Sequence, residues 1–165
     1  MTPLSTTAQP ASAPAQPPVQ PPTLILPGLW QAGMPLDWAW ATRAGIEVIV
    51  DVNDADHVHP AERVAGLRYV KDPLTDAAQV PDAEQLDALV SLTVDAVRAG
   101  RQVLVHCGFG KNRSGLVVAL AVRELLGVDG RTALAHVRSI RTRAVNNATF
   151  AAYVEELPAP ELVAG

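Results

Sequence analysis

The sequence predicts an α/β fold in which helices flank a central sheet, and three observations support this prediction. Short apolar runs alternate with longer segments that have helical spacing. The clearest of these runs, residues 46–52 and 102–105, are rich in β-branched residues and almost wholly apolar, which is typical of strands covered on both faces. Beyond a proline-rich start, about 143 residues remain, enough for one domain with one core.

In the first half of the chain, three strands and one helix are predicted. Residues 29–32 form a short strand after a Pro-Gly turn, and residues 34–44 form a helix that ends at Gly45. Residues 46–52 form a buried strand. Residues 67–70 form a weaker strand, which leads into a loop that carries two aspartates.

In the second half, a long helix begins at Pro81 and runs to about Ala99, with leucine or valine recurring on one face. A buried strand follows at residues 102–105. An apolar helix over residues 115–126 stops at Gly127. Two further helices complete the domain, at residues 131–140 and 148–156.

The first 22 residues contain seven of the 14 prolines and no charged side chain. Such a segment buries too little apolar surface to offset the entropy of ordering, so it predicts a disordered or polyproline-like tail. We expect this tail at residues 1–23, a folded domain at residues 24–158 and a short C-terminal tail at residues 159–165. Because no charged anchor lies beside the prolines, the first tail is interpreted as a linker.

The composition argues against several classes of protein. The single cysteine excludes an intramolecular disulfide framework and a cysteine-based zinc cluster. No apolar run is long enough to span a bilayer, and the first residues lack the basic and apolar regions of a signal peptide. We therefore expect a cytoplasmic protein with no stable membrane insertion.

Charge is distributed unevenly along the chain. The net charge of −4 argues against nucleic acid as a partner. Residues 37–95 carry 12 acidic and 4 basic side chains, whereas residues 98–143 carry 9 basic and 2 acidic ones. A bound anion would explain the net charge of +7 (9 − 2) in the second of these segments.

Residues 103–115 combine a buried strand, a loop with two glycines and the start of an apolar helix. Ligands of α/β sheets bind beyond the carboxyl ends of the strands, and Cys107 lies at such an end. The loop amides and the helix N-terminus can converge on an anion, because Gly108 and Gly110 allow a close approach. Arg113, six residues after Cys107, can donate two hydrogen bonds to a phosphate group. The pattern favours a dianion as the ligand.

The same positive field favours the thiolate form of a cysteine. We therefore expect Cys107 to be a nucleophile at neutral pH without a dedicated base. His106 should point to the other side of the strand, where it would hydrogen-bond the loop backbone and fix the position of the cysteine. Ser114 can donate a hydrogen bond to the sulfur and make it a better leaving group.

The residues from His106 to Gly115 read H-C-x5-R-S-G, and this motif resembles the signature of the cysteine-dependent protein tyrosine phosphatase superfamily. The compact chain resembles its dual-specificity branch over about residues 27–157. The resemblance implies a central, mostly parallel sheet of about four or five strands flanked by helices, with residues 24–158 as the catalytic domain. It also implies hydrolysis of phosphomonoesters through a cysteinyl-phosphate, with phosphorylated tyrosine, serine or threonine in proteins as substrate and no metal or cofactor. Cys107 would attack phosphorus, and the phosphate would be bound by Gly108, Phe109, Gly110, Lys111, Asn112 and Arg113.

The resemblance further implies an aspartate as general acid, roughly 30 residues before the cysteine. Asp76 precedes Cys107 by 31 residues, and we favour it over Asp72, which lies closer to the strand end. The same carboxylate would act as a base toward water in the second step. Asn147 resembles the asparagine that often precedes the last helix in these enzymes, with Asn146 as an alternative. Either would cap that helix and brace the phosphate loop.

Lys111 widens the choice of substrate. A Gly-Lys pair shortly before the arginine resembles family members that act on phosphoinositides or inositol phosphates. The relatives with the strongest lipid preference often have a second lysine nearer the cysteine, where this chain has Gly108 and Phe109. Phosphoinositide or inositol phosphate hydrolysis is therefore one alternative, and a non-catalytic phosphate-binding module is another. The physiological substrate and the oligomeric state stay open at the level of sequence.

Other chemical groups have ordinary interpretations. His57 and His59 are spaced like metal ligands, yet no further ligand set accompanies them, so we predict a solvated loop and no metal site. The three tryptophans are expected to pack in the core and against helices. Arg138, Arg141 and Arg143 are predicted to form a solvated helix face, with a basic rim for phosphorylated substrates as the alternative.

Overall fold

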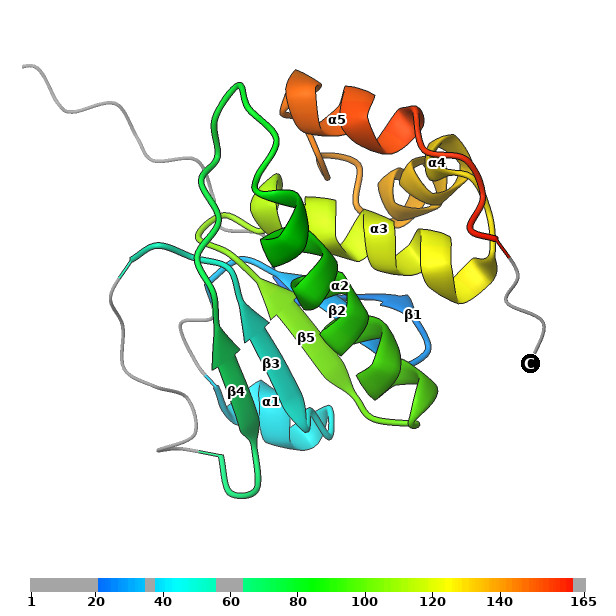
Figure 1. The fold of residues 1–165 in the computed structure, drawn as a ribbon. Helices are drawn as coiled ribbons and strands as arrows, with labels where there is room; N and C mark the ends of the chain where they lie inside the picture. Colours follow the sequence, from blue (N-terminus) through cyan, green and yellow to red (C-terminus); the bar gives the residue numbers. More distant parts are fainter. Residues whose placement is uncertain (1–20, 35–37, 56–63, 162–165) are drawn as a thin grey trace, which may run out of the picture.

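The computed structural model describes residues 21–34, 38–55 and 64–161 of the 165-residue chain (Figure 1). The proline-rich segment up to residue 20, the two histidines at positions 57 and 59, and the last four residues lie outside the described part. None of the helices within the described part is both long and apolar enough to cross a membrane.

Strands and helices alternate through the described residues as predicted. The strands are β1 (Thr23–Leu26), β2 (Leu29–Ala32), β3 (Val48–Asp51), β4 (Arg68–Lys71) and β5 (Val103–His106). The helices are α1 (Ala39–Arg43), α2 (Ala83–Arg98), α3 (Arg113–Leu126), α4 (Gly130–Ile140) and α5 (Ala148–Glu155). Strand β1 was not predicted, and it begins at Thr23, the last residue that the sequence analysis assigned to the tail.

The five strands form one sheet in the order β1-β2-β5-β3-β4 (Figure 1). Neighbouring strands run parallel except at the edge, where β1 pairs with β2 in antiparallel orientation. This confirms the predicted central, mostly parallel sheet. Strand β5 lies in the middle, and its last residue, His106, pairs with Ala32 of β2 and Asp51 of β3. The carboxyl ends of three strands therefore meet at one edge.

Helices cover both faces of the sheet (Figure 1). On one face, α1 packs through Trp38 and Ala41 against a cluster that includes Leu104 of β5. On the other face, α2 and α3 lie on the sheet, and α4 and α5 pack against α3. Cys107 belongs to the core of this second face. The sheet therefore presents Cys107 at its central carboxyl edge, on the side covered by most of the helices.

Helix α3 begins earlier than the sequence analysis predicted, at Arg113 rather than Gly115. Its first ten residues are buried, which explains why the segment is apolar all round. The helix ends as predicted at Gly127, which has the left-handed φ of 64° that a C-terminal glycine allows. The early start brings the Arg113 side chain into the first turn of the helix.

Candidate active site

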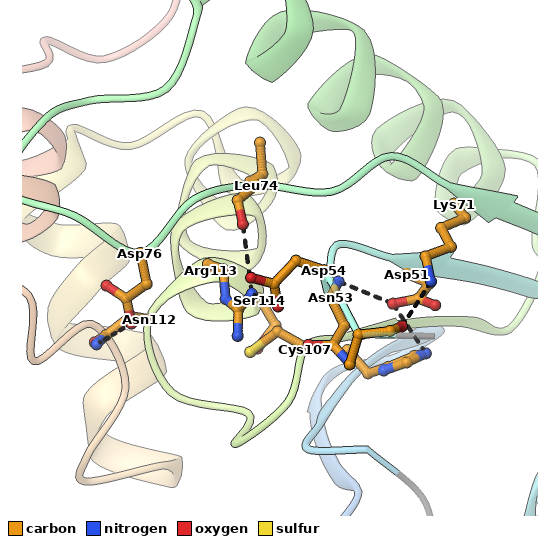
Figure 2. A network of polar contacts seen from close by, with 12 residues as sticks. Asp51, Asn53, Asp54, Lys71, Leu74, Asp76, Cys107, Asn112, Arg113 and Ser114 are labelled. Atoms are coloured by element: carbon orange, nitrogen blue, oxygen red, sulfur yellow. Dashed lines mark hydrogen bonds and ion pairs between the residues drawn. The ribbon is translucent and has the colours of Figure 1, made fainter. Parts of the chain in front are cut away.

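Cys107 is buried and directly follows β5, as the first residue of the loop that leads into α3. The Gly110 N–H donates a hydrogen bond to its Sγ, with the nitrogen 3.2 Å away. The Ser114 Oγ lies 3.3 Å from the same sulfur. Figure 2 shows Cys107, Ser114 and Arg113 side by side. Two hydrogen-bonding groups therefore face the Cys107 sulfur.

Gly110 gives the loop its shape. Its φ is +69°, and a Cβ at this position would lie 2.3 Å from the Gly33 nitrogen and 2.4 Å from the Ala32 carbonyl carbon. Its carbonyl accepts hydrogen bonds from Gln31 Nε2 at 3.2 Å and from Arg141 Nη2 at 2.9 Å. Because the peptide plane is rigid, holding this carbonyl also fixes the direction of the next N–H, which points the opposite way. Gln31 and Arg141 thus orient the loop through their hydrogen bonds to the Gly110 carbonyl.

Arg141 is buried at the end of α4. Its Nη1 donates to the Pro21 carbonyl at 2.7 Å and to Thr23 Oγ1 at 2.6 Å, in addition to its contacts with Gly110. Burial lowers the pKa of Arg141 to about 10, against the opposing effect of the nearby Cys107. The guanidinium remains a cation at neutral pH, and it ties β1 to the loop.

This placement corrects the prediction of a solvated helix face for Arg141 and, in part, for Arg138. Arg141 forms neither a solvated face nor a basic rim, because its side chain is enclosed by backbone carbonyls. Arg138 is half-buried and donates to the carbonyls of Ala144 at 3.1 Å and Val145 at 2.6 Å. Arg143 is exposed. Sequence spacing could not separate these roles, since all three residues lie near one helix end.

Arg113 directs its guanidinium over the loop. Its Nη1 donates to Asp54 Oδ1 at 2.7 Å and to the Leu74 carbonyl at 3.4 Å (Figure 2). Its Nη2 would lie 3.4 Å from a Cβ placed on Gly108. The hydrogen bond and charge of Arg113 lower the pKa of Asp54, whose side chain is 71% exposed. An anion that enters the loop would therefore compete with Asp54 for this donor.

The two candidate aspartates face different partners. Asp76 accepts a hydrogen bond from Asn112 Nδ2 at 2.9 Å (Figure 2). It accepts a second one from Asn147 Nδ2, also at 2.9 Å. Asp72 accepts a hydrogen bond from Gln85 Nε2 of α2 at 2.6 Å. The structure therefore places Asp76 against the loop and Asp72 against a helix. The assignment of Asp76 as the acid stays a prediction.

Asn147 caps α5 as the sequence analysis expected of it or its neighbour. Its Oδ1 accepts from the N–H groups of Thr149 at 3.0 Å and Phe150 at 3.2 Å. Its Nδ2 also donates to the Ala77 carbonyl at 2.7 Å. The alternative, Asn146, is exposed. One asparagine thus joins the start of α5 to the segment that carries Asp76.

His106 lies on the sheet face opposite to Cys107. Its Nε2 is 3.6 Å from Asp51 Oδ1, and its ring meets the Trp38 ring edge-on at 5.6 Å between centroids. Asp51 also accepts a hydrogen bond from the Tyr69 hydroxyl. These contacts are with the neighbouring strand β3 and with Trp38 just before α1, and the role of His106 in fixing the loop backbone stays a prediction.

The remaining loop residues differ in exposure. Phe109 is exposed, and Lys111 and Asn112 are half-buried. The Lys111 carbonyl accepts a hydrogen bond from the Val145 N–H at 2.9 Å. The Val145 N–H thus holds the loop backbone at Lys111, and Phe109 is the most exposed of these three residues.

Several residues of the site were not identified from the sequence. Gln31 is a polar residue in an otherwise apolar strand, and this contrast was an available signal. Asp54 follows a buried strand end, as ligand-binding residues of α/β proteins often do. Arg141 offered no such signal, because arginine near the end of an amphipathic helix is usually solvated.

Comparison with known proteins identifies the same family that the H-C-x5-R-S-G motif resembles. A family model described as "Dual specificity phosphatase, catalytic domain" matches residues 37–157. Dual specificity protein phosphatase 1 of Arabidopsis thaliana is 38% identical over 71 residues, which are 43% of this chain and 36% of the relative. Triple specificity protein phosphatase PtpB of Mycobacterium tuberculosis is 40% identical over 65 residues, 39% of this chain and 22% of the relative. The matches thus span well under half of either relative's length.

Solved structures extend the likeness over most of the chain. The crystal structure of a mouse putative dual specificity phosphatase complexed with zinc tungstate superposes with a TM-score of 0.72 and 25% identity. The superposition covers 89% of this chain and 91% of that one.

Proposed function

The chain belongs to the dual-specificity phosphatase family, and on this premise we propose that it hydrolyses phosphomonoesters through a cysteinyl-phosphate on Cys107. The proposed substrate is a protein that carries phosphotyrosine, phosphoserine or phosphothreonine. The observation that supports this most is the convergence of the Gly110 N–H and the Ser114 hydroxyl on Cys107 Sγ. The buried guanidinium of Arg113 lies beside the same loop.

In the first step, the Cys107 thiolate attacks phosphorus, and the bond from phosphorus to the substrate oxygen breaks. The loop amides and Arg113 hold the remaining phosphate oxygens, with the phosphate displacing Asp54 from the guanidinium. Asp76 gives its proton to the departing oxygen. The mouse neighbour was crystallised with zinc tungstate, and tungstate resembles phosphate as a tetrahedral oxyanion.

In the second step, ionised Asp76 accepts a proton from water, and the water oxygen attacks phosphorus. The bond between phosphorus and sulfur breaks, and Cys107 leaves as a thiolate. The Ser114 hydroxyl, 3.3 Å from the sulfur, donates to this thiolate and stabilises it as a leaving group. Inorganic phosphate is the product, and Asp76 is protonated again for the next turnover.

The test is release of inorganic phosphate from phosphotyrosine and phosphoserine peptides by the full chain, with EDTA present. We expect turnover without added metal. Tight binding of inorganic phosphate with no turnover would instead favour the non-catalytic binding module.

We predict that Asp76→Ala lowers kcat for phenyl phosphate by about 10²-fold, because an unactivated phenolate leaves slowly without a proton. Binding of inorganic phosphate, measured by competitive inhibition, should change little. Asp72→Ala is the matched control, and a larger loss in that variant would contradict the assignment.

Hydrolysis of phosphoinositides or inositol phosphates is a second candidate, which Lys111 supports. Its side chain is half-buried in the phosphate loop, where a second cation suits substrates with several phosphates. We predict that Lys111→Ala lowers kcat/KM about tenfold more on inositol polyphosphates than on a phosphotyrosine peptide. A panel of these substrates measures the difference, and equal losses on all of them would eliminate this candidate.

A further inference from the structure

Asn112 joins three parts of the site through one side chain. Its Nδ2 donates to Asp76 Oδ2 at 2.9 Å, and its Oδ1 accepts from the Asn147 N–H at 2.9 Å. The residue itself belongs to the phosphate loop and directly precedes Arg113. The loop, the segment with Asp76 and the start of α5 therefore meet at a single amide.

The Asp76 carboxylate is held from two sides. Asn112 Nδ2 binds one oxygen and Asn147 Nδ2 binds the other. Asn147 is fixed in turn, because its Oδ1 caps α5 and its N–H is bound by Asn112. The two amides form a pair, and the carboxylate lies between them.

This pair matters because Asp76 is exposed on a loop. An exposed aspartate has several rotamers of similar energy, and only a geometry that faces the leaving oxygen is productive. Each carboxyl oxygen retains a second lone pair after accepting one hydrogen bond, so one oxygen can still carry the proton. The amides thus restrict the direction of the carboxyl group without blocking proton transfer.

We propose that Asn112 is a positioning residue for the general acid, which it holds over the phosphate loop together with Asn147. This inference rests on the proposed function, because it assigns Asn112 a part in the same reaction. It differs from phosphate binding, since the contact to Asp76 uses the side chain, whereas a loop residue contributes to an anion cradle through its backbone N–H.

The leaving group of the substrate separates positioning from a general structural effect. Phenyl phosphate needs a proton on the departing oxygen, whereas 4-nitrophenyl phosphate releases a much more acidic phenol that leaves without help. We expect Asn112→Ala to lower kcat/KM about tenfold for phenyl phosphate and less than about twofold for 4-nitrophenyl phosphate. Asn146→Ala, one position before Asn147 and exposed, is the matched control and should leave both values unchanged.

A double variant gives the decisive comparison. In an Asp76→Ala background, Asn112→Ala should not change the ratio of the two rates further, because its effect passes through Asp76. Inhibition by inorganic phosphate should remain within about twofold in the single variant, as a measure of an intact loop. If Asn112→Ala does not fold, Asn112→Ser supplies a shorter, neutral polar side chain that lacks the amide donor to Asp76, and the same ratio of the two rates is measured.

Equal losses on the two substrates, or an added change of the ratio in the Asp76→Ala background, would overturn the inference while leaving the proposed function intact. A wild-type chain that binds inorganic phosphate and hydrolyses neither substrate would overturn the proposed function, and this inference with it.

Discussion

Cys107→Ser is expected to reduce phosphate release by about 10⁴-fold or more, because a serine hydroxyl is not ionised near neutral pH. The described contacts of the Cys107 sulfur come from Gly110 and Ser114, neither of which is a base that could activate a serine hydroxyl. The Gly110 N–H and Ser114 hydroxyl that face the sulfur should be satisfied by the serine oxygen, so the fold should persist. Steady-state turnover of 4-nitrophenyl phosphate and of a phosphotyrosine peptide measures the loss.

Binding provides the control for this variant. Inorganic phosphate should still bind Cys107→Ser, since Arg113 and the loop amides are unchanged, and isothermal titration can measure the affinity. A variant that folds, binds phosphate and keeps full turnover would show that Cys107 is not the nucleophile. The proposed cysteinyl-phosphate would then be wrong.

Gly110→Ala is expected to destabilise the protein by about 3 kcal/mol or more and to abolish turnover. The added Cβ would lie 2.3 Å from the Gly33 nitrogen and 2.4 Å from the Ala32 carbonyl carbon, both of which are backbone atoms that cannot rotate away. The φ of +69° adds the ordinary penalty of about 1 kcal/mol for a side chain in the left-handed region. Urea unfolding measures the first effect, and phosphate release measures the second.

Gly127→Ala isolates the contribution of backbone conformation. Gly127 has a similar φ of +64°, but nothing lies within 4 Å of a Cβ built there. This variant should lose only about 1 kcal/mol and keep its activity. If the two variants were equally stable, the close approach of Ala32 and Gly33 to the loop would not limit the choice of residue at position 110.

Much of the fold followed from local patterns. The β-branched run at residues 46–52 and the apolar spacing of residues 83–98 each predict an element without reference to distant residues. Strand β1 was missed because it is short and follows a proline-rich segment, so its local sequence resembles the end of a tail. The strand is stabilised by its pairing with β2 and by the hydrogen bond from Arg141 to the Thr23 hydroxyl.

The residues of the candidate site likewise fall into a group that local sequence predicts and a group that it does not. The proposed nucleophile Cys107, two loop glycines and an arginine lie within one short segment, so the sequence could predict an anion-binding loop there. The supporting residues come from distant parts of the chain: Gln31 lies 79 residues and Arg141 31 residues from the Gly110 carbonyl that both of them bind. Only folding brings such residues together, and no local pattern marks them.

The sequence by itself determined the α/β class, the end of α3 at Gly127 and the loop from Cys107 to Arg113, because each depends on residues that are neighbours in the chain. The tertiary structure decided which aspartate faces the loop, since Asp76 and Asp72 differ in their partners and not in their chemistry. It also decided that Arg141 is buried and that Asn112 holds Asp76. The physical reason is that hydrogen bonds between distant residues depend on the packing of whole elements, which local spacing does not encode.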